Sequence, residues 1–236
     1  MALDVLVLAA HPDDAEISLG GTILKLLSQG KTVGVCDVTK GEMGTRGSQE
    51  ERAEEARLAT QTLGLTARFN LGLPDGRVQS TLEARESLAR LLREQRPTLL
   101  IAHHTVDHHP DHAATGRLAQ EAWYLSGLKR LAELDGGPEA KRPRRLLHFA
   151  SHLTFEPTFV VPIDDVWDRK VEVIRCYSSQ LTAQEPGDDG SHFLFGADIL
   201  SRAETKARYW GEMVGSRYGE PLLHRGPISL SDPLGF

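Results

Sequence analysis

The stretch Leu3–Glu16, LDVLVLAAHPDDAE, decides the fold of the chain. Its first part, Leu3–Ala10, is apolar apart from one aspartate, which is typical of a strand buried on both faces of a parallel sheet. Polar residues follow at once. Apolar positions at helical spacing then resume over Ile17–Gln29, where Gly30 is placed to end a helix. The stretch therefore predicts a strand, a polar turn and a helix in succession.

The same alternation continues along the chain. Ser48 and Glu51 form a capping-box pattern at the start of one helix. Alternating strands and helices favour an α/β, Rossmann-like, three-layer fold with a mostly parallel central sheet and right-handed crossovers. The further strands are expected at Thr32–Val38, Ala67–Leu71 and Thr98–Ala102, and the further helices at Ser48–Leu63, Thr81–Gln95 and from about Asp111 to Leu125.

The pattern is weaker beyond Leu125. Two polar loops, at 135–145 and 182–192, are candidates to close over a substrate. Because the chain has no internal repeat or low-complexity tract, we expect one domain over residues 1–236. Strands are expected at Leu146–Ser151 and Thr158–Ile163, and helices at Asp164–Cys176 and Ala197–Met213.

Composition excludes several function classes. The formal net charge is −6 with acids and bases interspersed, so a nucleic-acid partner is not expected. No apolar run approaches the ~20 residues of a membrane span, and no basic segment precedes the first apolar run. We expect Cys36 and Cys176 to be buried free thiols, which fits a reducing, cytoplasmic location.

A second polar segment, HHTVDHHPDH at His103–His112, follows the strand expected at Thr98–Ala102. It holds five of the chain's ten histidines. Ligands of doubly wound sheets bind at the carboxyl ends of the strands. If this strand neighbours the first one, the histidine segment and the HPDD turn converge.

Such convergence predicts a metal site. His11 and Asp14 could supply two ligands from one loop, and His112 or His109 a third, which leaves a position for water as in catalytic zinc sites. Because Asp13 is adjacent to Asp14, one carboxylate would bind the metal while the other faces the water. For either segment alone, a capping or surface position is the better explanation, but two such segments at equivalent strand tips favour a site.

The motifs AHPDDAE at 10–16 and HPDH at 109–112 resemble those of the LmbE-like, or PIG-L, family of zinc-dependent N-deacetylases. The segment KGEMGTRGSQEERAEEA at 40–56 resembles a further motif of that family. The insertion of Ala15 between the second aspartate and Glu16 is similar to the motif of the family branch that acts in bacillithiol biosynthesis. So are CYSSQ at 176–180 and YGEPLLHRGPISL at 218–230, which extends the resemblance over almost the whole chain.

This resemblance implies roles for the residues at the two strand tips. It makes Asp13 the general base, and His109, as an imidazolium, the acid or the oxyanion stabiliser. Asp111 either orients a histidine ring or caps its helix. The implied metal ligands are His11, Asp14 and His112, with Zn²⁺ as the cofactor, although Fe²⁺, Mn²⁺ or Co²⁺ would also fit such ligands.

The resemblance also implies contacts with a substrate. A guanidinium binds a carboxylate through paired hydrogen bonds, so Arg52 and Arg46 are candidates to bind a carboxylate of the substrate. Glycines 41, 44 and 47 would let the loop before Arg52 turn tightly. The remaining expectations are substrate contacts from Tyr177 and Gln180, a position at the mouth for His192 and Arg217, packing roles for Trp123, Trp167 and Trp210, and no catalytic role for His103, His104 or His108.

The activity implied is removal of the N-acetyl group from an N-acetylglucosamine-type substrate, namely N-acetylglucosaminyl malate of bacillithiol biosynthesis. The alternatives are deacetylation of another amino sugar, amidase action on bacillithiol conjugates, metal binding without catalysis, and nucleotide binding. The last would require G-x-G-x-x-G where HPDDAE stands. Relatives in this branch imply a homo-oligomer, a trimer or hexamer, that takes a small amino sugar as its substrate.

Overall fold

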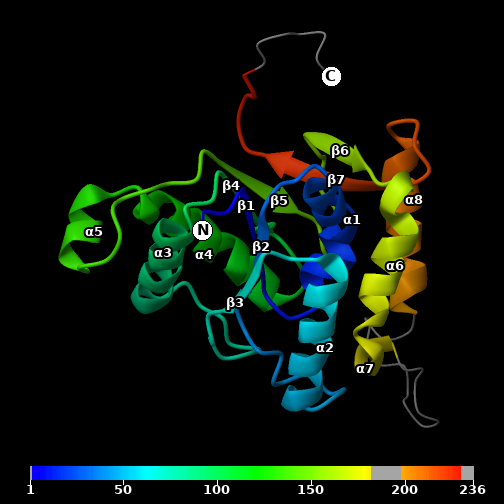
Figure 1. Cartoon of the computed structure of the whole chain (residues 1–236), viewed down its shortest axis with the longest axis horizontal. Coiled ribbons are helices and arrows are strands. Elements are labelled where there is room, and N and C mark those ends of the chain that lie inside the picture. Colours follow the sequence, from blue (N-terminus) through cyan, green and yellow to red (C-terminus); the bar gives the residue numbers. More distant parts are fainter. Residues whose placement is uncertain (1, 182–197, 230–236) are drawn as a thin grey trace.

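The computed structural model of the chain describes residues 2–181 and 198–229 (Figure 1). A seven-stranded sheet in the order β3-β2-β1-β4-β5-β7-β6 forms its centre. The first five strands in this order are parallel, whereas β7 runs antiparallel to both β5 and β6. The strands are β1 (Val5–Ala9), β2 (Val33–Asp37), β3 (Ala67–Asn70), β4 (Leu99–His103), β5 (Arg145–Phe149), β6 (Phe159–Pro162) and β7 (Gly219–His224).

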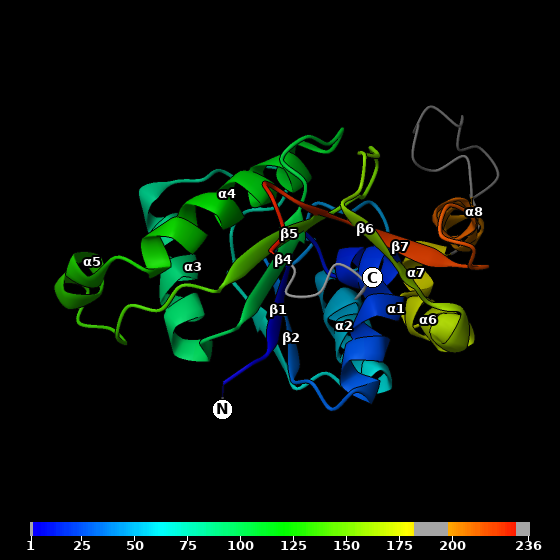
Figure 2. The same ribbon diagram turned by 90° about the horizontal axis from the view of Figure 1, so that it is seen from above.

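Helices cover both faces of the sheet (Figures 1 and 2). One hydrophobic cluster joins the sheet to α1 (Asp14–Ser28), α2 (Gln49–Leu63), α6 (Trp167–Arg175) and α8 (Ile199–Glu212). The other joins it to α3 (Leu82–Gln95) and α4 (Pro110–Ser126). The predicted three-layer α/β fold with a mostly parallel sheet is therefore confirmed. The shorter helices are α5 (Lys129–Leu134), η1 (Asp164–Val166) and α7 (Ser178–Leu181).

Burial on both faces explains the continuous apolar run of β1. Val5, Val7 and Ala9 pack in the cluster with α1, while Leu6 and Leu8 pack in the cluster with α3 and α4. None of these five residues is more than 3% exposed. Alternate side chains of a strand point to opposite faces, so a strand covered on both sides needs apolar residues throughout.

The order of the strands reverses between β1 and β4, which lie side by side with Val5 opposite Leu99. Their carboxyl ends therefore meet at the crevice where α/β sheets bind ligands, as the sequence predicted. Gly116 lets α4 lie close against the end of β4, because a Cβ there would stand 2.7 Å from the backbone oxygen of His103. This close approach places the first turn of α4 beside the end of β1.

Several boundaries differ from those expected. Helix α1 begins at Asp14 rather than at Ile17, and α4 begins at Pro110, whose fixed φ suits a first helical position. The capping box at Ser48 is confirmed, since Ser48 Oγ accepts from Glu51 N at 3.1 Å and Ser48 N donates to Glu51 Oε2 at 2.7 Å.

Strand β7 was not predicted, because its sequence GEPLLH shows no strand periodicity. Its glutamate, Glu220, is 2% exposed and lies against α1. There it accepts hydrogen bonds from Gly21 N, Thr22 N and Thr22 Oγ1, and pairs with Lys170 Nζ at 2.7 Å. A buried carboxylate satisfied by such contacts lies outside the alternation of apolar and polar residues that predicts a strand.

The remaining expectations concern single residues and membranes. Cys36 is buried and Cys176 only half-buried, and both are free thiols. Trp167 and Trp210 are buried in packing positions, and the half-buried Trp123 donates to Pro143 O at 2.8 Å. Within the described residues, no helix has the length and hydropathy that crossing a membrane requires.

Candidate metal centre

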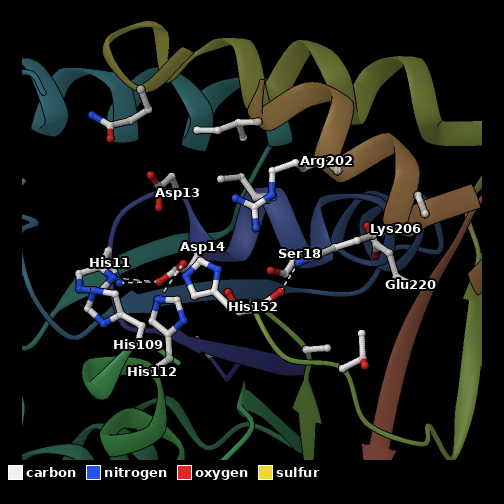
Figure 3. Close-up of a pocket in the computed structure, with 18 of the residues that line it drawn as sticks. His11, Asp13, Asp14, Ser18, His109, His112, His152, Arg202, Lys206 and Glu220 are labelled. Carbon is white, nitrogen blue, oxygen red and sulfur yellow. Dashed lines mark hydrogen bonds and ion pairs between the residues drawn. The ribbon is translucent and has the colours of Figure 1, made fainter. Parts of the chain in front are cut away.

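The three predicted ligands converge at the ends of β1 and β4 (Figure 3). His11 lies in the turn after β1, Asp14 is the first residue of α1, and His112 lies in the first turn of α4. His11 Nδ1 is 3.3 Å from Asp14 Oδ2, and His112 Nε2 is 3.3 Å from Asp14 Oδ1. One nitrogen or oxygen from each of the three residues lies within 4.8 Å of the others.

This donor set fits a divalent cation. Two imidazole nitrogens and one carboxylate oxygen are ligands that Zn²⁺ takes in catalytic sites. The ring nitrogen of His11 that faces away from Asp14, Nε2, lies 3.3 Å from Asp111 Oδ2. The corresponding nitrogen of His112, Nδ1, lies 3.2 Å from Asp107 Oδ1. Carboxylates placed in this way orient metal-binding histidines and leave the inner nitrogen unprotonated.

The charges at this centre also suit a cation. Burial opposes ionisation of Asp14, yet the adjacent His112 and His103 hold its pKa well below the ordinary value. Burial likewise opposes a charge on His112, but Asp14 and Asp107 raise its pKa to about 9. The metal-free cavity therefore favours protonated His11 and His112 against the carboxylates, and a bound metal ion would displace those protons.

Asp13 lies beside these ligands but is held separately. Its φ of 116° is in the region that favours glycine, so its backbone is strained. Its Oδ2 accepts a hydrogen bond from Arg52 at 3.2 Å, and burial raises its pKa to about 7. Strain and a dedicated partner together keep this carboxylate out of the three-residue cluster and directed at the cavity.

Arg52 fixes the turn that carries these residues. It is 5% exposed, and its Nη2 donates to the backbone oxygen of Pro12 at 2.6 Å as well as to Asp13. A Cβ on Gly41, whose φ is 70°, would lie 2.8 Å from Arg52 Cζ. Gly41 therefore has two roles: it allows the positive φ of the turn, and it leaves room for the Arg52 guanidinium. Arg52 also lines the cavity, and a substrate contact there remains a prediction.

His109 caps α4 and lies over the same centre. Its Nδ1 accepts a hydrogen bond from Asp111 N at 3.2 Å, and its ring stacks 4.7 Å from that of His112. Burial and the neighbouring His112 lower its pKa. Because Nδ1 accepts from the backbone, a neutral His109 ring carries its proton on Nε2, and the lowered pKa disfavours the imidazolium expected from the sequence. It can still donate a hydrogen bond to a developing oxyanion.

Asp111 does not cap the helix, so that alternative from the sequence is wrong. Besides His11, its carboxylate accepts hydrogen bonds from the backbone N–H groups of Gly76 at 2.7 Å and Val78 at 3.1 Å. It thereby ties the segment after β3 to His11, one of the predicted ligands. The ring that Asp111 orients is that of His11, because His109 bonds only to its backbone.

The other predicted contact residues occupy different places. Gln180 lines the cavity and donates to Arg46 O at 2.9 Å, so Arg46 lies just behind the wall. Tyr177 is 1% exposed within the hydrophobic core, and it packs there instead of reaching the cavity. Arg217 is exposed over the ring of Tyr218 rather than at the mouth.

Only one of the two loops expected to close over a substrate, 135–145, lies within the described residues. His192 and the loop 182–192 lie outside the described residues. No residue of the other loop, 135–145, lines the cavity. His104 and His108 do not line the cavity either.

Four residues that sequence reasoning missed belong to the centre. His103 Nε2 lies 3.2 Å from Asp14 Oδ2, and Asp75 Oδ1 lies 3.1 Å from His11 Nε2. The strand period could have identified His103, since it shares the face of Ile101, which packs toward α1. The other two are Asp107, already described beside His112, and His152, whose ring stacks on His112 at 4.9 Å.

The centre forms one end of a cavity of about 430 Å³. Helix α8 forms the opposite wall, from which Arg202 and Lys206 reach toward the space above Asp14 and Ser18 (Figure 3). The buried pair Lys170–Glu220 closes this side. The cavity is large enough for a small organic substrate.

A family profile described as "PIG-L: GlcNAc-PI de-N-acetylase" matches residues 6–123. Diacetylchitobiose deacetylase of Thermococcus kodakarensis is 30% identical over 92% of this chain and 81% of its own. A probable N-acetyl-α-D-glucosaminyl L-malate deacetylase 2 of Bacillus anthracis is 28% identical, over 76% of this chain and 82% of its own.

Other similar proteins extend the comparison. 4-Oxalmesaconate hydratase of Pseudomonas putida is 28% identical over 74% of this chain and 73% of its own. Among solved structures, a conserved protein of Thermus thermophilus, TT1542, superposes with a TM-score of 0.85 at 36% identity, covering 99% of both chains. The matched residues 6–123 carry both strand tips and all three residues of the cluster.

Proposed function

The chain belongs to the PIG-L family, and we propose that it is a metal-dependent hydrolase that removes the N-acetyl group from N-acetylglucosamine-type substrates. The observation that carries the proposal is the cluster of His11, Asp14 and His112 beside Asp13, a half-buried carboxylate that is not part of it. The cluster provides a seat for a cation, and Asp13 provides a base within the same cavity.

The reaction adds water to the amide carbonyl and releases acetate and the free amine. A divalent ion held by His11, Asp14 and His112 would lower the pKa of water and polarise the carbonyl. Asp13 takes the proton of the attacking water, and Arg52 holds its carboxylate in place for this step. His109 donates its Nε2–H toward the oxyanion, while its Nδ1 remains bonded to the helix backbone.

A proton must also reach the departing nitrogen. Asp13 acquires one when water attacks, and the amine needs one when the C–N bond breaks. A carboxylate whose pKa is raised by burial toward neutrality can do both in turn. Asp13 thus acts first as the base and then as the acid, and His109 does not have to exist as an imidazolium.

Within this class, N-acetylglucosaminyl malate is the substrate that we propose. The motifs shared with the bacillithiol branch and the likeness to the Bacillus anthracis relative support it. N,N′-Diacetylchitobiose is the second candidate, since the relative from Thermococcus kodakarensis is named for it. We further propose a single-domain, homo-oligomeric, cytoplasmic enzyme, which size-exclusion chromatography and fractionation of cells would test.

Acetate release tests the proposal. The purified chain would be assayed with and without Zn²⁺ or Fe²⁺ on N-acetylglucosaminyl malate, N,N′-diacetylchitobiose, N-acetylglucosamine and a bacillithiol conjugate. We expect metal-dependent acetate release from at least one acetylated sugar. Absence of acetate from all of them, with water addition to an unsaturated dicarboxylate instead, would contradict deacetylation and favour the reaction for which the Pseudomonas putida relative is named.

A further inference from the structure

Two cationic side chains occupy one face of α8. Arg202 and Lys206 are separated by one helical turn, and both line the cavity. Ala203 and Ala207, which also line it, are small and leave the space in front of the cations open. Like charges at this spacing destabilise a helix. A lysine that is directed into a cavity beside an arginine is therefore unfavourable unless a negative charge lies near its ammonium.

Lys206 lacks such a charge within the described residues. Its half-buried ammonium forms no ion pair there and donates instead to the backbone oxygen of Ser151. Burial, followed by the charge of Arg202, lowers the pKa of Lys206. An anion bound at this point would reverse both effects, because it would replace lost hydration and balance the charge.

The nearby carboxylates are committed elsewhere. Glu220 is paired with Lys170 at 2.7 Å and satisfied by α1. Asp107 faces His112 and accepts hydrogen bonds from the backbone N–H groups of His109 and His152. The Lys206 ammonium thus places a positive charge on the α8 wall of the cavity, whereas the opposite end carries Asp13, Asp14 and Asp75.

The positive wall lies within reach of the metal centre. Ser151, which accepts from Lys206, precedes His152, and the ring of His152 stacks on His112. A substrate whose acetamide lies at the centre would extend its other end toward α8. Figure 3 shows Arg202 and the histidine cluster facing the same space.

We propose that Lys206, one helical turn after Arg202 on α8, forms a subsite for an oxyanion, a carboxylate or a phosphate, on the part of the substrate remote from the acetamide. The inference rests on the proposed deacetylase function and narrows it to anionic amino sugars. The anion is bound by α8 rather than by Arg52, because the Arg52 guanidinium already donates to Asp13 and to the backbone of Pro12.

Matched substrates test the subsite. Acetate release would be measured as kcat/KM for N-acetylglucosaminyl malate, for its neutral dimethyl ester and for N-acetylglucosamine 1-phosphate. The variants are Lys206→Met, which keeps the length of the side chain, and Lys206→Arg, which restores the charge. Arg208→Gln is the control, since Arg208 lies on the same helix but pairs with Glu204 outside the cavity.

For the wild type we expect an anionic substrate to exceed the diester in kcat/KM by about tenfold to a hundredfold, as for a charged hydrogen bond. Lys206→Met should abolish most of this ratio, Lys206→Arg should recover it, and Arg208→Gln should leave it unchanged. Preference for the malate glycoside or for the phosphate identifies which oxyanion the subsite takes. An unchanged ratio in Lys206→Met, with metal content and thermal stability retained, overturns the subsite.

Binding separates this inference from the deacetylase proposal. If no substrate releases acetate, deacetylation fails, and calorimetry with glucosaminyl malate and with methyl glucosaminide, which has the same amine but no carboxylate, then decides the subsite. Tighter binding of the malate glycoside, weakened by Lys206→Met and by added salt, supports the subsite without deacetylation. Equal affinities for the two ligands overturn it.

Discussion

The tips of β1 and β4 and the region of β7 and α8 face each other across one cavity, but they are built differently. The tips carry short polar turns after parallel strands, with Asp13 strained at a φ of 116°. The other region is an antiparallel addition, with the ion pair Lys170–Glu220 at its base. The tips thus carry the residues of the proposed reaction. The region of β7 and α8 contributes to the stability of the fold and to the proposed selection of the substrate.

The largest effect is expected from Asp13→Asn. Loss of the base should lower kcat by about 10²- to 10⁴-fold, whereas the three ligands and the metal content remain. Asp13→Gly should be equally inactive but more stable to urea, because glycine relieves the positive φ. Steady-state kinetics and metal analysis measure both variants, and near-normal turnover by Asp13→Asn would remove Asp13 from the mechanism.

Glu220→Gln tests the other region and should reduce stability. Breaking a buried pair leaves Lys170 uncompensated, which costs about 3–5 kcal/mol of unfolding free energy. Urea titration measures the change, and metal content should persist. The exposed pair Arg130–Glu133 provides the control, since Glu133→Gln should cost less than about 1 kcal/mol. Equal losses would show that burial of the pair contributes nothing.

Asp107→Asn tests a contact between the tip of β4 and the segment that follows β5. Asp107 faces His112 and also accepts from the backbone N–H groups of His152 and Leu153. A neutral amide should orient the ligand less firmly and weaken the affinity for metal about 10- to 100-fold. Competition with a chelator measures this affinity, with the exposed Asp165→Asn as the control. Unchanged affinity would limit Asp107 to a structural role.

The smallest effect is expected at the start of α2, which carries Arg52. Ser48→Ala removes the acceptor of the capping box and should cost about 0.5–2 kcal/mol of unfolding free energy. Thr81→Ala removes the corresponding cap of α3, which carries no residue of the centre. We expect similar stability losses in thermal melts but a larger rise in KM for Ser48→Ala, and equal KM values would separate the cap from the site.

The two regions also differ in how far the sequence predicted them. The tips were predictable because the buried run of β1 fixes a parallel strand, and polar residues directly after such a strand reach the ligand crevice. Tertiary contacts explain what was missed. Asp75 and His152 belong to segments that reach the centre only after β3 and β5 are aligned, and Glu220 is buried against α1.

The role of α8 was missed for a related reason. Arg202 and Lys206 follow the ordinary pattern of a helix with a charged face. Nothing in the sequence shows that this face lines a cavity instead of facing solvent. Asp111 could not be settled from sequence either, because a cap and a contact with His11 require the same residue at the same place.

Isothermal titration calorimetry of Zn²⁺ binding to the metal-free protein tests the central claim most directly, with His112→Ala as the comparison. If the ends of β1 and β4 hold one ion together, the wild type binds one ion per chain, and the loss of His112 weakens this binding by orders of magnitude. Equal affinity in the two proteins, or no binding by the wild type, would contradict the account.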